Sequence, residues 1–434
     1  MIPARRLLLL LLIVLCAVTL LSIVPVLQPD WTVLGSVLAG ILLFDALTVW
    51  QKQPLQIERK LMHAQSLGTW SKVDLILHNH YRYPLSLQVF DHHPAALVQD
   101  GLPLKVNIPA NNWVRLQYQI RPIERGPAIF EKIQIRINSA LGLWQKNIVQ
   151  ELQSEIRIYP NFSSVMKYTL LATDQRLNQM GILRKRRRGE GLDFHQLREY
   201  RDGDSLRQID WNATARTRKL ISRDYQEERD QQVVFLLDCG RRMLAQDDEL
   251  SHFDHTLNAI LLLSHVALRQ GDAVGLMTFS GHDRWLPPKK SIGSVNAILN
   301  AIYDLQPSLL SPDYTQAAMR LMSKQRRRAL VVLLTNLRDE DETELLPALY
   351  LLRKRHLVLV ASLQECSINA MLDAEVRGFT SALEYAAAQQ YLNYRREAHQ
   401  KIERQGVLAF DVEPASLPIH IVNRYLEIKD RGQL

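Results

Sequence analysis

The run QQVVFLLDCGRRM, residues 231–243, decides the fold of the second half of the chain, because a continuous apolar stretch leads directly into a polar turn. Unbroken apolar runs are typical of strands that are covered on both faces of a parallel sheet. Similar runs follow at 273–279, 329–335 and 357–363, with helical patterns between them. The alternation predicts a Rossmann-type α/β domain over 231–434, with a mostly parallel sheet and carboxyl-terminal helices.

The longest helical pattern covers about 382–405. Ser381 and Glu384 have the spacing of a capping box at its start, and Gly406 follows its end. We therefore expect this helix to begin directly after Ser381.

Upstream, residues 53–160 change to short alternating runs separated by turn sequences, and a period of two is typical of strands with one buried face. These runs predict a β-sandwich-like domain. Four histidines stand out within it: His78, His80, His92 and His93. The first two share a strand face at a spacing that metals use, but a convincing third ligand is missing apart from Asp91. Solvent-facing histidines are the favoured interpretation, and a metal site is the alternative.

The first 52 residues contain two apolar runs, at about 7–27 and 31–50, and the second carries only Asp45 as a charge. Each is about as long as a helix needs to be to cross a bilayer. A cleaved signal peptide fits less well, because the first run is long and a second follows at once. We therefore predict a transmembrane helical hairpin over residues 1–52, and hence a membrane-anchored α/β protein in contact with the lipid bilayer.

Basic residues flank this predicted hairpin. Arg5 and Arg6 precede it, Lys52 and Arg59 follow it, and the turn between the runs carries none. The positive-inside rule then places both termini and the folded domains in the cytoplasm. The same membrane segment accounts for the formal net charge of +8 more simply than nucleic acid does, so no nucleic-acid partner is expected.

Residues 161–230 join the two domains. They include five consecutive basic residues at 184–188. Three roles stay open for this run: a solvated linker is favoured, a contact with anionic lipid or an acidic partner comes next, and a nucleic-acid contact is the least favoured. The stretch GEGLDFHQLREYRDGDSLRQIDWNATARTRKLISRDY, residues 189–225, then interleaves acidic and basic residues with aromatic ones. Interleaved Arg and carboxylates predict a partly buried ion-pair network, with Trp211 buried among them.

This stretch resembles the signature of the bacterial domain-of-unknown-function family fifty-eight. The positions that match it in spacing are Gly189, Gly191, Phe194, Leu197, Arg198, Glu199, Tyr200, Gly203, Asp204, Arg207, Ile209, Asp210, Trp211, Ala215 and Arg216. The resemblance implies a von Willebrand factor A-like domain and association with MoxR-type AAA+ ATPases, but no known reaction. It also fits the amino-terminal hairpin, and so implies the bacterial inner membrane as the location.

Many von Willebrand A domains hold a divalent cation through D-x-S-x-S, a Thr and a later Asp, and hard cations need such oxygen ligands. In this chain Asp238 is present, but the other positions fall on Gly240, Arg242, Pro312 and Asn336. A guanidinium close to Asp238 would replace the cation by an ion pair. We therefore predict a degenerate site without metal, and no cofactor.

Motifs of other chemistries are missing from the sequence, which has no P-loop, H-E-x-x-H, G-x-S-x-G or C-x-x-C. The favoured function is therefore a non-enzymatic adaptor that docks a MoxR-type AAA+ ATPase. An enzyme that uses Asp204 and Asp210 is one alternative, although nearby Arg residues disfavour general-acid work. A metal-dependent adhesion protein is the other.

The proposed docking surface combines the strand-end edge at Asp238, Arg241, Arg242 and Asn336 with the charged signature. Arg side chains often contribute much of the binding energy at interfaces. Replacing Arg241 and Arg242 by Glu is expected to weaken capture at least tenfold, about 1.4 kcal/mol.

Overall fold

The structure is a computed structural model of the whole chain. It describes residues 2–22, 31–50, 54–161, 193–201, 206, 209–226, 231–247, 250–291 and 293–433. The chain divides into two compact units, Met1–Tyr159 and Pro160–Leu434, and each is described by itself. The basic run at 184–188 lies outside the described residues, as do the predicted signature positions Gly189, Gly191, Gly203, Asp204 and Arg207.

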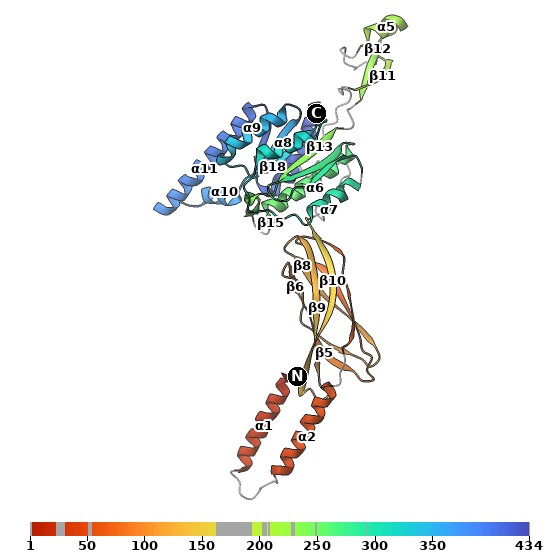
Figure 1. Ribbon diagram of the computed structural model, residues 1–434, viewed down its shortest axis with the longest axis vertical. Helices are drawn as coiled ribbons and strands as arrows, with labels where there is room; N and C mark the ends of the chain where they lie inside the picture. The colour runs from red at the N-terminus through yellow and green to blue at the C-terminus, as the bar shows by residue number, and fades with distance from the viewer. Residues whose placement is uncertain are drawn as a thin grey trace. The chain divides into compact units, whose positions relative to one another are not determined.

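The two apolar runs at the amino terminus form helices α1 (Arg5–Ser22) and α2 (Trp31–Trp50) (Figure 1). Over the residues that the structure describes, no helix combines the length and the apolar character that crossing a membrane requires. The predicted transmembrane hairpin, with spans at 7–27 and 31–50, is therefore wrong, and with it the membrane-anchored fold class. The localisation drawn from it, the inner membrane with both termini in the cytoplasm, is overturned as well.

The charge-free part of each helix is shorter than the apolar run in the sequence suggested. Helix α1 starts with two arginines and ends at Ser22, so its charge-free part is residues 7–22, about 24 Å at the α-helical rise. In α2 only residues 31–44 precede the buried Asp45, about 21 Å. Both lengths fall short of the hydrocarbon core of a bilayer, which is about 30 Å thick.

Asp45 ties α2 to the loop before strand β10. Ser139 Oγ donates to its carboxylate at 2.5 Å, and the backbone N–H groups of Leu141 and Leu143 donate at 2.9 and 3.2 Å. The charge that interrupts the apolar run is therefore a satisfied structural contact, since each donor lowers the cost of burying a carboxylate.

The rest of the first unit consists of two sheets (Figure 1). One has the order β1 (Ile2–Pro3), β10 (Trp144–Tyr159), β9 (Gly126–Asn138), β5 (Leu85–Asp91) and β7 (Leu104–Ile108), with β3 (Ala64–Ser66) also paired to β10; the other has the order β2 (Gln56–Lys60), β4 (Ser71–His78), β8 (Trp113–Pro122) and β6 (Leu97–Asp100). Alternate residues are buried along the strands, which explains the period of two in the sequence.

Asp91 of β5 connects these two sheets. Arg59 of β2 donates to it through Nη2 at 2.6 Å and Nε at 2.9 Å, and the Tyr118 hydroxyl of β8 donates at 2.7 Å. Burial raises the pKa of Tyr118 far above its ordinary value, and the Asp91 charge adds to the increase. The carboxylate is therefore part of the core and is not available as a histidine-site ligand.

The signature segment forms a hairpin in the second unit. Strands β11 (Asp193–Glu199) and β12 (Ile221–Gln226) pair antiparallel, and the short helix α5 (Trp211–Thr217) lies between them in the chain. Ile209 and Ser222 are buried in this hairpin and form an isolated bridge.

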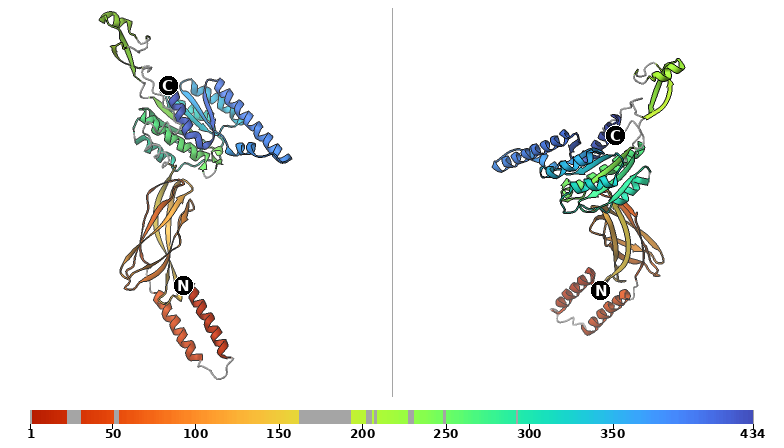
Figure 2. Two further views of the ribbon diagram at one scale, coloured as in Figure 1. Left: turned by 180° about the vertical axis from the view of Figure 1, so that it is seen from behind. Right: turned by 45° about the horizontal axis from the view of Figure 1, so that its top comes forward.

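The α/β region has a six-stranded sheet with the order β17 (Trp285–Lys289), β16 (Ala273–Phe279), β13 (Gln232–Asp238), β18 (Leu330–Thr335), β19 (Leu357–Leu363) and β20 (Leu408–Val412). All neighbours are parallel except β17. The helices form two layers (Figure 2): α6 (His252–Arg269), α7 (Gly293–Ile302) and α12 (Leu417–Asp430) on one face, and α8 (Tyr314–Lys324), α9 (Glu342–Arg353) and α11 (Phe379–Arg404) on the other.

Strand β13 shows why its interior, residues 233–237, is apolar at every position. Val233, Phe235 and Leu237 are buried in the core under the first helix layer, and Val234 and Leu236 in the core under the second. Each such side chain contributes about 1.5–3 kcal/mol through burial. The carboxyl ends of β13, β18, β19 and β20 consequently meet along one edge of a sheet whose interior is fixed by packing.

Candidate functional site

The candidate site lies at the carboxyl edge of the six-stranded sheet, where ligands meet open α/β sheets. Asp238 ends β13, Thr335 ends β18, and Asn336 follows it; Glu365 comes after β19. Asp411 lies on β20. The sequence placed Asp238 and Asn336 at this edge, and the structure agrees.

Asp238 is fully buried and hydrogen-bonded. Its carboxylate accepts from the backbone N–H of Gly240 and from Thr335 Oγ1, both at 2.8 Å. Because the single Thr335 proton is directed at Asp238, the Tyr314 hydroxyl 2.9 Å away acts as the donor to Thr335. Burial raises the pKa of Asp238, although these hydrogen bonds oppose the shift.

Gly240 occupies a position that a larger residue could not enter. A Cβ there would lie 2.9 Å from the Leu310 carbonyl oxygen and 3.0 Å from Asp238 Oδ1. The metal-ligating Ser of the D-x-S-x-S pattern is therefore excluded by the loop that carries Leu310, and not merely absent from the sequence.

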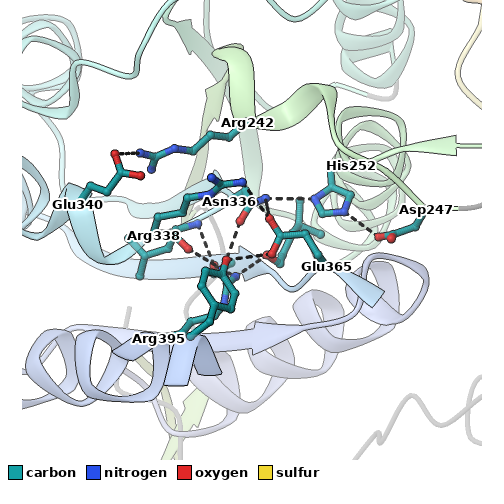
Figure 3. Close-up of polar contacts among 12 residues, drawn as sticks. Arg242, Asp247, His252, Asn336, Arg338, Glu340, Glu365 and Arg395 are labelled. Atoms are coloured by element: carbon teal, nitrogen blue, oxygen red, sulfur yellow. Dashed lines mark hydrogen bonds and ion pairs between the residues drawn. The ribbon is translucent and has the colours of Figure 1, made fainter. Parts of the chain in front are cut away.

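Arg242 forms an ion pair, but not with the predicted partner. Arg242 is 7% exposed, and its guanidinium contacts the Asp341 carboxylate closely, with Glu340 at 3.6 Å (Figure 3). The sequence suggested Asp238 as the partner. Because 3₁₀-helix η2 (Arg241–Leu244) directs the side chain towards η3 (Asp339–Asp341), the guanidinium instead fastens the turn after β13 to the start of α9.

A second polar network continues along the edge (Figure 3). His252 Nε2 lies 2.7 Å from Asp247 Oδ2, and its Nδ1 lies 3.4 Å from Asn336 Nδ2. With Nε2 donating to Asp247, Nδ1 is free to accept from the Asn336 amide. That amide also donates to Glu365 at 3.1 Å, and its oxygen accepts from Arg395 at 3.3 Å. Asn336 thus acts as donor and acceptor together, which the Asp of a cation site could not do.

Arg395 of α11 is the centre of this network and is only 2% exposed. It forms a bidentate pair with Asp411 at 2.6 and 2.7 Å. It also donates to the Leu337 carbonyl at 2.6 Å and to Ser362 Oγ at 2.8 Å. The guanidinium therefore joins α11 to the ends of β18, β19 and β20.

Glu365 stays ionised within this network. Burial raises its pKa, but hydrogen bonds from Asn336 and Tyr391 and the charges of Arg395 and Arg338 outweigh burial, so the pKa lies below its ordinary value. Glu365, Arg395 and the other members of the network were not predicted from the sequence. No local spacing marks them, because their partners are far away in the chain.

Most of the polar groups described above pair with one another, and the edge also exposes large apolar side chains. Leu309 and Leu310 are 83% and 59% exposed, and Leu244 is 43% exposed. Arg241 is exposed beside them, with its backbone N–H donating to the Leu310 carbonyl at 2.9 Å. Of the two arginines proposed for docking, only Arg241 is therefore available to a partner.

The signature hairpin differs from its prediction. Trp211 is 67% exposed, so its predicted burial is wrong. It is the first residue of α5, directly after Asp210, whose carboxylate caps the helix by accepting from Asn212 N and Ala213 N, both at 3.0 Å. Lys219 and Glu199 form an ion pair at 2.6 Å, and both side chains are well exposed, so this pair is not part of a buried network.

Of the remaining signature positions, Arg198, Tyr200 and Arg216 also lie in the hairpin region, and none of the three is fully buried. Tyr200 joins the hairpin through its backbone, which donates to the Leu220 carbonyl at 2.9 Å. Arg216 is exposed on α5, and the Arg198 guanidinium donates to the Glu199 carbonyl at 3.3 Å. In the described ranges, no three His, Cys, Asp or Glu side chains are grouped as they would be around a metal.

Comparison with known proteins finds a family whose model matches just under half of the chain. Residues 196–406 match the model of the family described as "Protein of unknown function DUF58", which confirms the resemblance seen in the signature. "Uncharacterized protein YeaD" of Bacillus subtilis (strain 168) is 22% identical over 180 residues. The match covers 40% of this chain and 41% of that protein, so the chain spans about two fifths of its curated relative.

Solved structures resemble parts of the chain only distantly. An aerotolerance-related membrane protein from Bacteroides fragilis NCTC 9343, with multiple mutations to serines, is 17% identical with a TM-score of 0.29, covering 45% of this chain and 98% of that one. Escherichia coli alpha-2-macroglobulin, from domain MG7 to the C-terminus, is 20% identical with a TM-score of 0.21, covering 25% and 17%. At these scores neither bears on function.

Proposed function

Because residues 196–406 belong to the DUF58 family, whose function is unknown, we propose from the geometry that this chain is a non-enzymatic protein-interaction adaptor. Its docking surface is the exposed part of the sheet edge: Arg241, Leu244, Leu309 and Leu310, called here the edge surface. The partner proposed is a MoxR-type AAA+ ATPase, in the assembly or maturation of protein complexes or in envelope stress functions.

The edge surface supports this proposal because several large, strongly exposed apolar side chains in one region of a protein often mark an interaction site. Leu309 is 83% exposed, and Arg241 next to the leucines supplies the residue type that is enriched in binding hot spots. The polar groups behind them are rigid, since Arg242 is paired with Asp341 and Asp238 with Thr335. A rigid apolar patch loses little conformational entropy on binding.

The same contacts argue against a reaction at this edge. Asp238 accepts two hydrogen bonds inside the core, and the Arg395 guanidinium is fully engaged by Asp411 and neighbouring oxygens. Asp210, one of the two carboxylates considered for catalysis, caps α5. Its carboxylate is thus engaged by the backbone N–H groups of Asn212 and Ala213 in a structural role.

The test is capture of a purified MoxR-type ATPase from the same bacterium by the full-length chain. Arg241→Glu combined with Leu310→Asp is expected to weaken capture at least tenfold, about 1.4 kcal/mol, with an unchanged thermal melt. Arg326→Glu is the matched control, since Arg326 is exposed just before β18, at the other end of that strand. Normal capture by the folded double variant would rule out the edge surface as the docking site.

A further inference from the structure

The first unit contains a depression that the proposed adaptor role does not use. It has a volume of about 160 Å³ and is lined by Gln88, Phe90, Pro103, Gln134 and Arg136. Gln88 and Arg136 are cross-strand neighbours on β5 and β9, on the face opposite the buried Leu87 and Ile137. At about 30 Å³ per water molecule, the space is equivalent to about five waters, enough for a small polar group and part of an apolar group attached to it.

The side chains that line this depression are held in place from outside it. The ring of His92 packs edge-on against Phe90, with centroids 5.0 Å apart, and its Nε2 lies 3.2 Å from Gln134 Oε1. Arg136 Nε donates to Asn147 Oδ1 at 3.0 Å. Neighbours that fix the side chains of a binding site in this way reduce the entropy lost on binding. His92, one of the four histidines singled out in the sequence, is thus a positioning residue.

Apart from the Gln88 amide oxygen, the groups left over are hydrogen-bond donors. Over the described residues, neither Nη atom of Arg136 has a partner, and the same holds for the side-chain amide of Gln88. Gln134 uses its oxygen towards His92, which leaves its NH₂ group free. The lining contains no acidic residue, and Lys105 is the cross-strand neighbour of Gln88 on its other side. The depression therefore matches a ligand that accepts hydrogen bonds and carries negative charge.

We propose that this depression, the Arg136 pocket, binds a carboxylate attached to an apolar group. The planar guanidinium of Arg136 takes the carboxylate through its two Nη atoms, since Arg and carboxylate fit in a fork. Gln134 and Gln88 donate to the remaining lone pairs, and Phe90 and Pro103 contact the apolar group. A free carboxylic acid and the carboxyl terminus of a peptide share this chemistry.

Calorimetric titration of the full-length chain tests the proposal with three kinds of probe. Benzoate represents the free acid, and N-acetyl-Phe-Ala with a free carboxyl terminus represents the peptide. The corresponding amides, benzamide and N-acetyl-Phe-Ala amide, are isosteric but uncharged, and are expected to bind at least tenfold more weakly. Tighter binding of the peptide identifies a peptide terminus as the source, and tighter binding of benzoate a free acid. Equal binding of acids and amides overturns the proposal, as does binding only of a neutral sugar such as methyl glucoside.

Variants separate binding from folding. Arg136→Gln is expected to lose at least tenfold in carboxylate affinity. Arg136→Lys keeps the positive charge but cannot form the paired contacts of a guanidinium, so its affinity should lie between those of the parent and of Arg136→Gln. Asn147→Ala leaves the lining intact and releases Arg136, so a several-fold loss supports positioning. Arg82→Gln is the control, because Arg82 is an exposed arginine of the β4–β5 connection outside the lining. Unchanged affinity in a folded Arg136→Gln variant refutes the Arg136 pocket.

Discussion

The arginine at the centre of the edge network gives the sharpest test of how the sheet edge is held together. Replacing Arg395 by Met keeps the length and apolar stem of the side chain but removes the guanidinium. Asp411 then loses its bidentate partner, and the Leu337 carbonyl and Ser362 hydroxyl each lose a donor. Breaking a buried pair from one side costs about 3–5 kcal/mol, because the other charge stays behind unpaired.

The magnitude depends on how much water reaches the groups left behind. The Asp411 side chain is 22% exposed, so water can partly solvate the charge left behind, and the cost of breaking the pair should lie at the lower end of that range. The Leu337 carbonyl loses a donor as well, and a lost hydrogen bond of this kind adds about 1 kcal/mol. We therefore expect Arg395→Met to lower the unfolding free energy by about 4 kcal/mol in urea titration, which for a region of this size corresponds to about 8–16 °C in melting temperature.

Two further variants make this result decisive. Arg396→Met changes the exposed neighbour and should stay within about 0.5 kcal/mol of the parent. Arg395→Met combined with Asp411→Leu removes both charges, so much of the lost stability should return. A loss under about 1 kcal/mol in Arg395→Met would refute the reasoning, because it would mean that water or other donors already satisfy the network.

Three other predictions concern the metal, the signature and pH. Calorimetric titration of Mg²⁺ or Mn²⁺ into the full-length chain should show no binding that depends on Asp238; micromolar binding lost in Asp238→Ala contradicts this. Trp211→Ala should cost less than about 1 kcal/mol in a thermal melt, because the ring is exposed, and a loss of 3 kcal/mol or more would mean that it is covered. Burial lowers the pKa of His356 to about 4. As the pH falls, His356 therefore takes up a proton in the unfolded chain before it does so in the folded chain. The unfolding free energy should then fall by roughly 3 kcal/mol between about pH 6.5 and pH 4. His356→Phe should flatten that part of the stability–pH curve, and an unchanged slope would count against it.

The sequence by itself determined the strands and the order of the α/β region. The apolar runs at 273–279 and 357–363 coincide with β16 and β19, because a strand covered on both faces is mostly apolar along its whole length. Parallel strands end at one edge, so Asp238 and Asn336 could also be placed there. Helix α11 was found but begins at Phe379: Ser381 lies inside its first turn, where its hydroxyl accepts from the Gly378 backbone N–H at 3.0 Å.

The tertiary structure alone decided which groups are covered and which partners they have. Arg395 reaches Asn336 across 59 residues, and Asp45 receives its donors from a loop more than 90 residues away, so no local pattern could reveal either contact. Composition suggested that Trp211 is buried, but burial depends on what packs over a side chain, and α5 presents its first residue to solvent. Gly240 looked like a lost metal ligand in the sequence; the Leu310 carbonyl oxygen, 2.9 Å from where its Cβ would lie, is the physical reason that only glycine fits there.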